Sequence, residues 1–497
     1  MAMDRRRFAL GAATLGLGAM AASTPLLAAT KTRPGAGTKP VAKAAARQAG
    51  EPDVLILGAG ISGLQASHML EEQGLKVAII EGRDRVGGRI MTLLDQPGYP
   101  EMGFNSMGEG YGRGLDVATR AGVTMQEVGS RYRIGPPPLL YIGNQAFTRD
   151  EWAKFPGNPF PDALKTAMPG ELAAMLVAQK TRLKDWNAWA DPVSAPLDIS
   201  LHDFLKQQGL SDKAIHLAYD IAPYYGRNAY DVSALMSEYN DGFVKAQIAA
   251  GPKSFAVKGG NLLMAQALAK QLKGDVLLGR EVVAITQGGD AGSRVTVHCK
   301  DGSVFSAPKV ICTLPFSTLR NVAIEPGLNG LQAEAVAQLG YQPISMVFLT
   351  ADTPFWEQDK LAPGMWTDGV LGNVIPQRYG EDPQQITGFI VQARGNLADY
   401  WDLLGAENAK ALIVARIEAL RPATKGKLRA HSYFSWSQER FNVGDFSYLA
   451  PGQVKWMADI AKPAGNLFFA GEHTATGARG LEGALESSER VVLEVIS

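Results

Sequence analysis

The sequence predicts an α/β protein in which a nucleotide-binding domain, assembled from three separate segments, is joined to a second, α+β domain. Three observations predict this fold. A strand–helix–strand pattern occupies Asp53–Ile80, alternating strands and helices return over Val257–Thr313, and a last strand and helix lie within Asn466–Val495. The two long stretches between these segments do not continue this alternation of strands and helices. At 497 residues the chain is also too long for one simple core.

The first segment contains a glycine-rich turn between a strand and a helix. Asp53–Leu57 is a short apolar run, which is typical of a buried parallel strand. Glycines follow with the spacing G-x-G-x-x-G, at Gly58, Gly60 and Gly63. The first allows a tight turn, the second lets the backbone approach a pyrophosphate, and the third lets the next helix, Ser62–Gln73, pack closely on the strand. This pattern predicts a Rossmann-like dinucleotide site.

Two further features of this segment favour a bound nucleotide over an empty glycine-rich turn. The second strand, Lys76–Ile80, ends at Glu81, where a carboxylate can accept hydrogen bonds from both ribose hydroxyls. Gly87 and Gly88 then precede Arg89, whose guanidinium can clamp a phosphate through two hydrogen bonds. The alternative for Arg89 is an exposed arginine on a surface loop.

The last segment again has a strand, a loop and a helix. The strand Asn466–Ala470 delivers Gly471 and Glu472 to the carboxyl end of the sheet, where open α/β folds bind ligands. Gly480 precedes a helix that runs from about Leu481 to Val495. The N-terminus of that helix carries partial positive charge and can stabilise an electron-rich group.

The second domain is predicted from the two intervening stretches. The first stretch contains helical patterns at Asp162–Leu183 and Leu201–Gln208, and the second mixes strands with a helix near Asn408–Leu420. The strands are expected at Ser345–Leu349, Thr387–Gln392 and Leu428–Trp436. We therefore expect the nucleotide domain to comprise residues 51–123, 252–320 and 438–497, and the second domain to comprise residues 124–251 and 321–437.

The N-terminus has the pattern of a targeting segment. Arg5–Arg7 precede Phe8 and a short apolar stretch, and Ala28-Ala29 suits signal cleavage. Paired arginines before such a stretch predict a twin-arginine signal over residues 1–29, recognised by the twin-arginine export machinery, with delivery to the periplasm. An uncleaved membrane anchor is the alternative. Residues 30–50, rich in Pro, Gly and Ala, are expected to be a disordered linker.

Composition excludes some classes of function. The formal net charge is +0, so nothing indicates a nucleic-acid partner. The chain has 2 cysteines, Cys299 and Cys312, and their spacing fits no metal motif, so no metal site is expected. Two buried thiols or one disulfide both remain open.

Together, the glycine-rich turn, the Gly-Gly-Arg motif and the C-terminal strand–loop–helix resemble the flavin-containing amine oxidase family, which includes monoamine, L-amino-acid and polyamine oxidases. The resemblance is specific at Asp53–Gly103 and Asn466–Ser488, moderate at Gly251–Leu319, and faint elsewhere. It implies an FAD cofactor contacted by Gly58, Gly60, Ser62, Gly63, Glu81, Arg83, Gly88, Arg89, Gly103, Phe104, Val282, Gly471, Glu472, Gly480 and Leu481.

The resemblance also implies a reaction. Hydride would pass from the carbon next to an amine nitrogen to flavin N5, the imine would hydrolyse, and oxygen or a periplasmic electron acceptor would reoxidise the flavin. Such chemistry depends on a neutral amine and a dry cavity more than on a protein acid–base pair. The leading alternative is an FAD-dependent desaturase or porphyrinogen-type oxidase acting on an apolar substrate. A flavin carrier without catalysis and a nicotinamide-dependent dehydrogenase fit the motifs less well, and a homodimer is left open.

Departures from the family pattern shape the expected site. Membrane-bound monoamine oxidases attach flavin through a cysteine, and the matching position here is Asp445, so the resemblance implies non-covalent FAD. Phe446 would be one aromatic residue of the substrate cage, while its usual facing aromatic matches Gly480. Trp436 is the next aromatic candidate, with a core tryptophan as the alternative.

Further residues are expected on the substrate side. Ser106 stands where L-amino-acid oxidases carry a carboxylate-binding arginine, which disfavours an α-amino acid. Met346 stands where many family oxidases have a lysine near flavin N5, which places reactivity with oxygen in doubt. His473 is expected to contact flavin or substrate, with a structural histidine as the alternative. Tyr224, Tyr225 and Arg227 are expected to border the substrate cavity, with core packing or a turn as the alternative.

Overall fold

A five-stranded parallel sheet forms the centre of the nucleotide-binding domain in the computed structural model, which describes residues 51–288 and 294–497. Its strand order is β21-β12-β1-β2-β8, and every neighbouring pair is parallel. The strands are β1 (Val54–Leu57), β2 (Val77–Ile80), β8 (Val276–Leu277), β12 (Lys309–Cys312) and β21 (Leu467–Phe469). All three predicted segments therefore contribute to one sheet, and the predicted fold class is confirmed.

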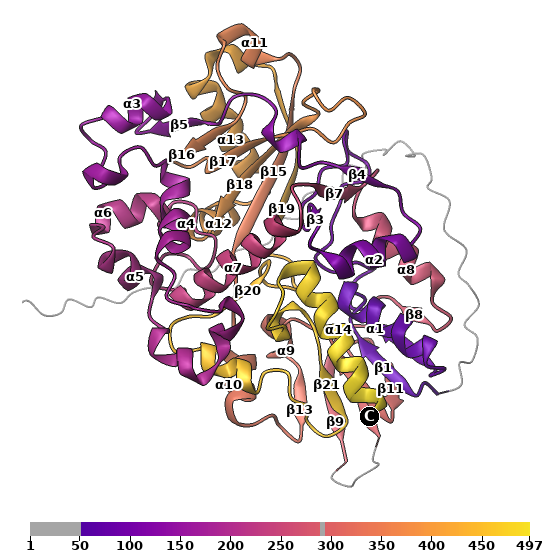
Figure 1. Ribbon diagram of the computed structural model, residues 1–497. Coiled ribbons are helices and arrows are strands. Elements are labelled where there is room, and N and C mark those ends of the chain that lie inside the picture. The colour runs from indigo at the N-terminus through magenta and orange to yellow at the C-terminus, as the bar shows by residue number, and fades with distance from the viewer. Residues whose placement is uncertain (1–50, 289–293) are drawn as a thin grey trace, which may run out of the picture. The chain divides into compact units, whose positions relative to one another are not determined.

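Alternating residues of β1 face two different layers, as the strand period of two requires. Val54 and Ile56 pack in one cluster with the helices α1 (Ile61–Glu72), α8 (Leu262–Gln271) and α14 (Gly480–Ile496). Figure 1 shows α14 lying beside α1, and the Ser488 hydroxyl at this contact donates to the Ser62 carbonyl at 2.9 Å.

The other face of the parallel sheet packs against a second, four-stranded sheet. Leu55 and Leu57 belong to the cluster that contains Ile285, Val295 and Val297 of that sheet. Its order is β11-β10-β9-β13, with β9 at Val282–Gln287, β10 at Val295–Cys299, β11 at Val304–Ala307 and β13 at Ala323–Glu325. Since β1 is covered on both faces, its continuous run of apolar residues is explained.

The second domain is built on a seven-stranded sheet of order β19-β15-β18-β17-β16-β5-β6. Both intervening stretches contribute to it, because β5 pairs in parallel with β16. Its strands are β5 (Leu139–Ile142), β6 (Gln145–Phe147), β15 (Ile344–Ala351), β16 (Met365–Thr367), β17 (Asn373–Gln377), β18 (Gly388–Arg394) and β19 (Leu428–Ser435). Figure 1 shows this sheet beside the helices α12 (Asn396–Leu404) and α13 (Ala406–Leu420).

Side chains of β15 alternate between the two sides of this sheet. Val347 and Leu349 pack in the cluster that contains the buried residues of α12 and α13. Ile344, Met346 and Phe348 pack in a different cluster, with Met102 of the nucleotide-binding domain. The side of the sheet that carries Met346 therefore faces the nucleotide-binding domain.

Smaller elements complete the two domains. The helices are α2 (Gly112–Arg120), α3 (Arg149–Lys154), α4 (Pro169–Lys180), α5 (Leu201–Gln207), α6 (Asp212–Ile215), α7 (Ala234–Ala250), α9 (Phe316–Leu319), α10 (Gly330–Gln338) and α11 (Phe355–Asp359). The short strands are β3 (Met107–Gly108), β4 (Met125–Glu127), β7 (Ser254–Val257), β14 (Gly340–Tyr341) and β20 (Ser447–Tyr448).

One predicted helix differs from the structure. The pattern at Asp162–Leu183 was expected to be continuous, but a 3-10 turn at Asp162–Leu164 is followed by a separate helix that begins at Pro169. Proline suits the first turn of a helix and cannot continue one, because it has no N–H to donate and its ring clashes with the preceding turn. The helix therefore begins at Pro169 instead of running through it.

Several expectations concern the chain's organisation. The predicted signal at residues 1–29 and linker at residues 30–50 lie outside the described residues. Residues 49–497 form one compact unit, and the predicted domain boundaries within it stay a prediction. In the described part of the chain, no helix is long and apolar enough to cross a membrane. Cys299 and Cys312 are both buried free thiols, which decides between the two alternatives.

Candidate active site

A cavity of about 570 Å³ lies at the carboxyl ends of the parallel strands. Gly58 follows β1, Glu81 follows β2, Thr313 follows β12, and Gly471 lies shortly after β21, and all four residues line the cavity. Ligands of open α/β sheets bind at this edge, where successive loops leave a crevice. The cavity continues toward the second domain, where Met346 and Arg394 line it.

The glycine-rich turn leaves room for a phosphate at the start of α1. Gly58 has φ +106°, and a Cβ there would meet the Thr313 hydroxyl oxygen at 2.5 Å. A Cβ on Gly63 would lie 2.1 Å from the Gly58 carbonyl oxygen, so this glycine allows close packing. A Cβ on Gly60 would meet no described atom within 4 Å, and no side chain of the described residues caps the helix there. The first N–H groups of α1 are therefore available to an anion.

Glu81 is held in position at the end of β2. Its side chain is buried, and its two carboxylate oxygens accept from the Ala59 N–H at 2.8 Å and the Arg83 N–H at 2.9 Å. The Arg83 side chain also donates to this carboxylate, from Nη1 at 3.3 Å. A carboxylate can accept about four hydrogen bonds, so capacity remains for a ribose hydroxyl. The orientation of this group is thus fixed by the protein before a nucleotide binds.

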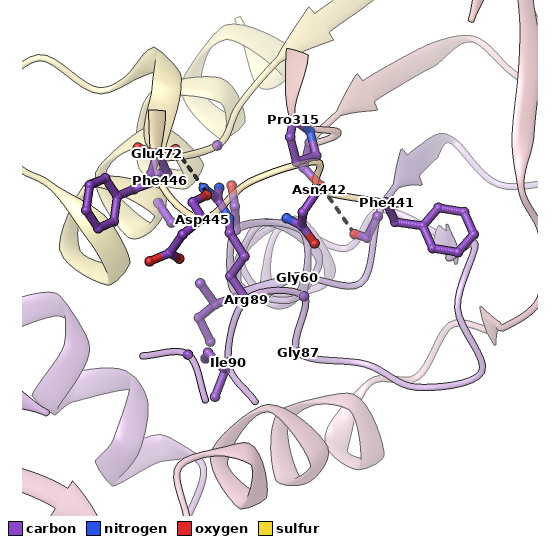
Figure 2. Close-up of a pocket in the computed structure, with 18 of the residues that line it drawn as sticks. Gly60, Gly87, Arg89, Ile90, Pro315, Phe441, Asn442, Asp445, Phe446 and Glu472 are labelled. Atoms are coloured by element: carbon purple, nitrogen blue, oxygen red, sulfur yellow. Dashed lines mark hydrogen bonds and ion pairs between the residues drawn. The ribbon is translucent and has the colours of Figure 1, made fainter. Parts of the chain in front are cut away.

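Arg89 joins the Gly-Gly-Arg motif to the C-terminal motif. Its Nη1 donates to the Glu472 carboxylate at 2.8 Å and to the Asp445 carbonyl at 2.6 Å, and Figure 2 shows Arg89 extending toward Glu472. Glu472 also accepts from the backbone N–H and the hydroxyl of Ser447, each at 3.0 Å. Burial alone would raise the pKa of Glu472, but the charge and hydrogen bond of Arg89, together with the attraction of His473 and Arg479, outweigh it and lower the pKa to about 2. The carboxylate is therefore ionised at neutral pH.

The end of the cavity in the second domain is largely apolar. Ile344 and Met346 enter it from β15, and Phe446 enters it from the loop before β20. Phe446 stacks on Tyr224 with ring centroids 5.4 Å apart and planes at 28°. Apolar and aromatic walls exclude water from a bound group.

The structure brings most of the predicted site residues together. The cavity is lined by Gly58, Gly60, Ser62, Glu81, Arg83, Gly88, Arg89, Gly103, Phe104, Ser106, Val282, Met346, Phe446, Gly471, Glu472, Gly480 and Leu481. Five predicted residues lie off this lining, namely Gly63, Tyr225, Arg227, Trp436 and His473. For Gly63 this agrees with its expected packing role.

The two aromatic residues that do not line the cavity pack against residues that do. Trp436 is fully buried, its Nε1 donates to the Met102 carbonyl at 2.7 Å, and its ring lies under Gly103. This is the position of a core tryptophan, the alternative for this residue. Tyr225 is also buried and packs edge-on against Phe446, with centroids 5.4 Å apart. Its neighbour Tyr224 lines the cavity, as expected, whereas Arg227 pairs with Asp399 at 2.7 Å away from the lining.

His473 occupies a buried position beside the site. Its ring lies 4.4 Å from the ring of Phe316, and neither ring nitrogen has a hydrogen-bond partner among the described residues. Burial lowers the pKa of His473 to about 4, against the attraction of Glu472, so the ring is neutral at pH 7. This placement fits a structural histidine better than a residue in contact with substrate.

Some cavity residues escaped sequence reasoning. Gln392 and Arg394 lie at the end of β18, in the faintest part of the resemblance, and no motif marks them. Phe441 and Asn442 come shortly before Asp445, and their nearness to that predicted position was a usable signal. Phe441 packs on Gly82, where a Cβ would lie 2.4 Å from its ring, so this loop covers the nucleotide end of the cavity.

The residues present fit FAD held without a covalent bond. Open space at Gly60, uncapped N–H groups, an oriented carboxylate at Glu81 and the guanidinium of Arg89 suit a ribose and a pyrophosphate. Among the described residues, no cysteine or histidine lines the cavity to form a flavin bond. Asp445 lines it instead, and burial raises the pKa of Asp445 to about 6.

Known proteins are similar to this chain over most of its length. The profile of the family described as flavin containing amine oxidoreductase matches residues 61–496. A flavin-dependent L-tryptophan oxidase of Lentzea aerocolonigenes is 25% identical over 471 residues, covering 88% of this chain and 97% of that protein. Human amine oxidase [flavin-containing] B is 23% identical, covering 89% of this chain and 86% of that protein.

Solved structures show the same fold. Putrescine oxidase bound to putrescine superimposes with a TM-score of 0.70 at 24% identity, covering 90% of this chain and 99% of that chain. Cyclohexylamine oxidase from Brevibacterium oxydans also gives a TM-score of 0.70, at 20% identity. The cofactor is thus FAD, the protein is an oxidoreductase, and the chain belongs to the family of flavin-containing amine oxidoreductases.

Proposed function

We propose that this enzyme oxidises an amine by removing hydride from the carbon next to nitrogen. The observation that carries the proposal is one continuous cavity, in which the FAD cradle passes into an apolar end lined by Met346, Phe446 and Tyr224. FAD supplies the hydride acceptor when bound. The apolar end favours the neutral form of the amine, because burying an ammonium without a partner is costly.

The side chains near this end position the substrate and exclude water. Glu472 is ionised and paired with Arg89, so it is a poor proton acceptor. His473 is neutral and lies behind the cavity wall. The reaction class therefore relies on placement of the amine against the cofactor, with hydrolysis of the product imine in water.

Anaerobic titration of the purified enzyme with amines tests this function. Primary, secondary and diamine substrates should be screened for bleaching of the flavin absorbance in the absence of oxygen. We expect at least one class to bleach it, with formation of the matching aldehyde or ketone. A flavin that none of the amines reduces, but that an apolar compound with a dehydrogenable C–C bond reduces, would contradict the proposal.

We further propose that the enzyme is exported to the periplasm by the twin-arginine machinery, and that it passes electrons there to oxygen or to another acceptor. Arg5–Arg7 ahead of a short, weakly hydrophobic stretch support this. Replacing Arg5 and Arg6 with lysine should hold the precursor in the cytoplasm. Normal delivery of that double variant would show that a different route is used.

A further inference from the structure

Arg394 reaches the reacting end of the cavity because of its place in the second-domain sheet. Residues of β18 and β15 pair in antiparallel register, Arg394 opposite Ile344 and Gln392 opposite Met346. Directly opposed residues put their side chains on the same face of a sheet. All four residues line the cavity. Arg394 therefore enters the cavity beside Ile344, on the wall that the second-domain sheet forms.

The terminal nitrogens of Arg394 are left free for a ligand. Its Nε donates to the Gln392 side-chain oxygen at 2.9 Å, and its guanidinium carbon lies 5.2 Å from the centre of the Tyr224 ring. Neither Nη1 nor Nη2 donates to a described residue, and no described carboxylate forms an ion pair with it. Four N–H donors on a partly buried guanidinium are thus available.

A structural arginine in the same domain, Arg421, has hydrogen-bond partners for all three of its guanidinium nitrogens. Arg421 is 1% exposed, and its Nε and Nη2 donate to the two carboxylate oxygens of Asp359 at 2.8 and 2.9 Å. Its Nη1 donates to the Ala362 carbonyl at 2.8 Å. The buried Arg378 has an Nε without a partner among the described residues, so an incompletely bonded guanidinium does not by itself mark a ligand site. What distinguishes Arg394 is that it lines the cavity, where a ligand can reach its terminal nitrogens.

The guanidinium is held by neighbouring side chains. It lies over the ring of Tyr224, which stacks on Phe446 at 5.4 Å and meets Tyr225 edge-on at 4.7 Å. Gln392 fixes the Nε side of the fork. A planar fork fixed on one edge presents its other edge in a geometry that matches the two oxygens of a carboxylate.

The charge of Arg394 is only partly balanced within the cavity. Asp445 lines the same cavity, and its carboxylate forms no hydrogen bond or ion pair with a described residue, but the charges of Arg89 and Arg394 act on it and lower its pKa against the larger effect of burial. Because no carboxylate of the described residues bonds to the Arg394 fork, a substrate anion can pair with it directly. A simple apolar amine leaves the guanidinium unpaired, and a diamine brings a second cation toward it, which costs affinity.

Building on the proposed function, we propose that Arg394 binds an anionic group of the substrate, so that the enzyme acts on amines that also carry a carboxylate. The serine at position 106 does not oppose this. An arginine was expected near that position for a carboxylate-bearing substrate, whereas here a guanidinium enters the cavity from β18, on a different wall. Arg394 is thus the residue that determines substrate class.

Ligand binding to the oxidised holoenzyme tests the anion site without turnover. Phenylacetate and its uncharged analogue phenylacetamide should be titrated while the flavin absorbance spectrum is recorded. We expect phenylacetate to bind about tenfold to a hundredfold more tightly, the range for losing a hydrogen bond to a charged group. Arg394→Met should remove this preference and Arg394→Lys should keep part of it. Arg429→Met is the matched control, because Arg429 is an exposed arginine of the same sheet, paired with Asp352.

The second test compares two substrates that differ only in the carboxylate. In the wild type, phenylalanine should bleach the flavin faster than phenethylamine, mainly because its KM is lower. In Arg394→Met, phenethylamine should be the faster substrate, and the variant should still contain one FAD for each protein chain. Faster bleaching by phenethylamine in the wild type, or an unchanged preference in Arg394→Met, would overturn the inference and leave the proposed amine oxidation standing. If phenylacetate binds through Arg394 but no amine reduces the flavin, the anion site is supported and the proposed function fails.

Discussion

Replacing Glu472 with glutamine should cost this protein far more stability than breaking an equally short ion pair elsewhere. The pKa of Glu472 falls from the ordinary 4.5 to about 2, despite a burial that would raise it, because Arg89 at 2.8 Å and the nearby His473 and Arg479 together favour the ionised form. Each tenfold change in an ionisation constant is worth about 1.4 kcal/mol. The native state therefore favours the ionised carboxylate by roughly 3 kcal/mol. Breaking a buried pair from one side typically costs about 3–5 kcal/mol, because a charge is left unpaired.

The matched control is Glu494→Gln. Glu494 pairs with Arg490 at the same 2.8 Å, but both side chains are 29% exposed, so we expect a loss below about 1 kcal/mol. Urea unfolding of the FAD-saturated variants at pH 7 measures both losses. Since the pKa of Glu472 is lowered on folding, its contribution is complete above about pH 4.5 and is lost as the pH falls toward 2. A loss in Glu472→Gln no larger than that in Glu494→Gln would refute the reasoning.

Three other predictions follow from the same site. Glu81→Ala should weaken FAD binding by about 2 kcal/mol or more, because a buried hydrogen-bonded carboxylate is lost, and titration of the apoprotein with FAD measures this. The control is Glu71→Ala, which removes a carboxylate that accepts from the backbone N–H groups of Lys273 and Gly274 and should bind FAD normally. Met346→Lys should speed reoxidation of the photoreduced enzyme, because an ammonium stabilises charge developing on oxygen where a thioether cannot. Stopped-flow mixing with aerated buffer measures the rate. Fast reoxidation in the wild type would show that Met346 does not limit this step. The pKa of His473 is lowered to about 4, so the unfolded chain binds a proton that the native chain does not between about pH 6.5 and 4. The free energy of unfolding, measured in urea, should therefore decrease as the pH is lowered from about 6.5 to 4. In His473→Gln this decrease should be smaller.

The parts of the fold that could be predicted are those that short stretches of sequence encode. The turn at Gly58, the carboxylate at Glu81 and the helix beginning near Leu481 follow from local spacing, and the structure has each of them. The parallel sheet could be expected too, because strands that alternate with helices have few other arrangements.

The second domain resisted prediction because its contacts are not local. The strand β5 pairs with β16 across a long separation in sequence, with Leu140 opposite Trp366, and no pattern in either strand specifies the other. For the same reason Arg394 could not be assigned to the cavity. Its role depends on register with β15 and on stacking against Tyr224, which is itself set by a different part of the chain. Trp436 illustrates the converse: an aromatic at a strand end can face the cavity or the core, and its bond to Met102 shows the core side.

The central claim is that this cavity holds FAD without a covalent bond. The most direct measurement is to denature the purified yellow protein with acid or heat, separate the precipitate, and identify the flavin in each fraction by chromatography and mass. The account predicts intact FAD in the supernatant, in amounts equal to the protein, and a colourless precipitate. Flavin that stays attached to the polypeptide, or a purified protein that carries and binds no flavin, would contradict it.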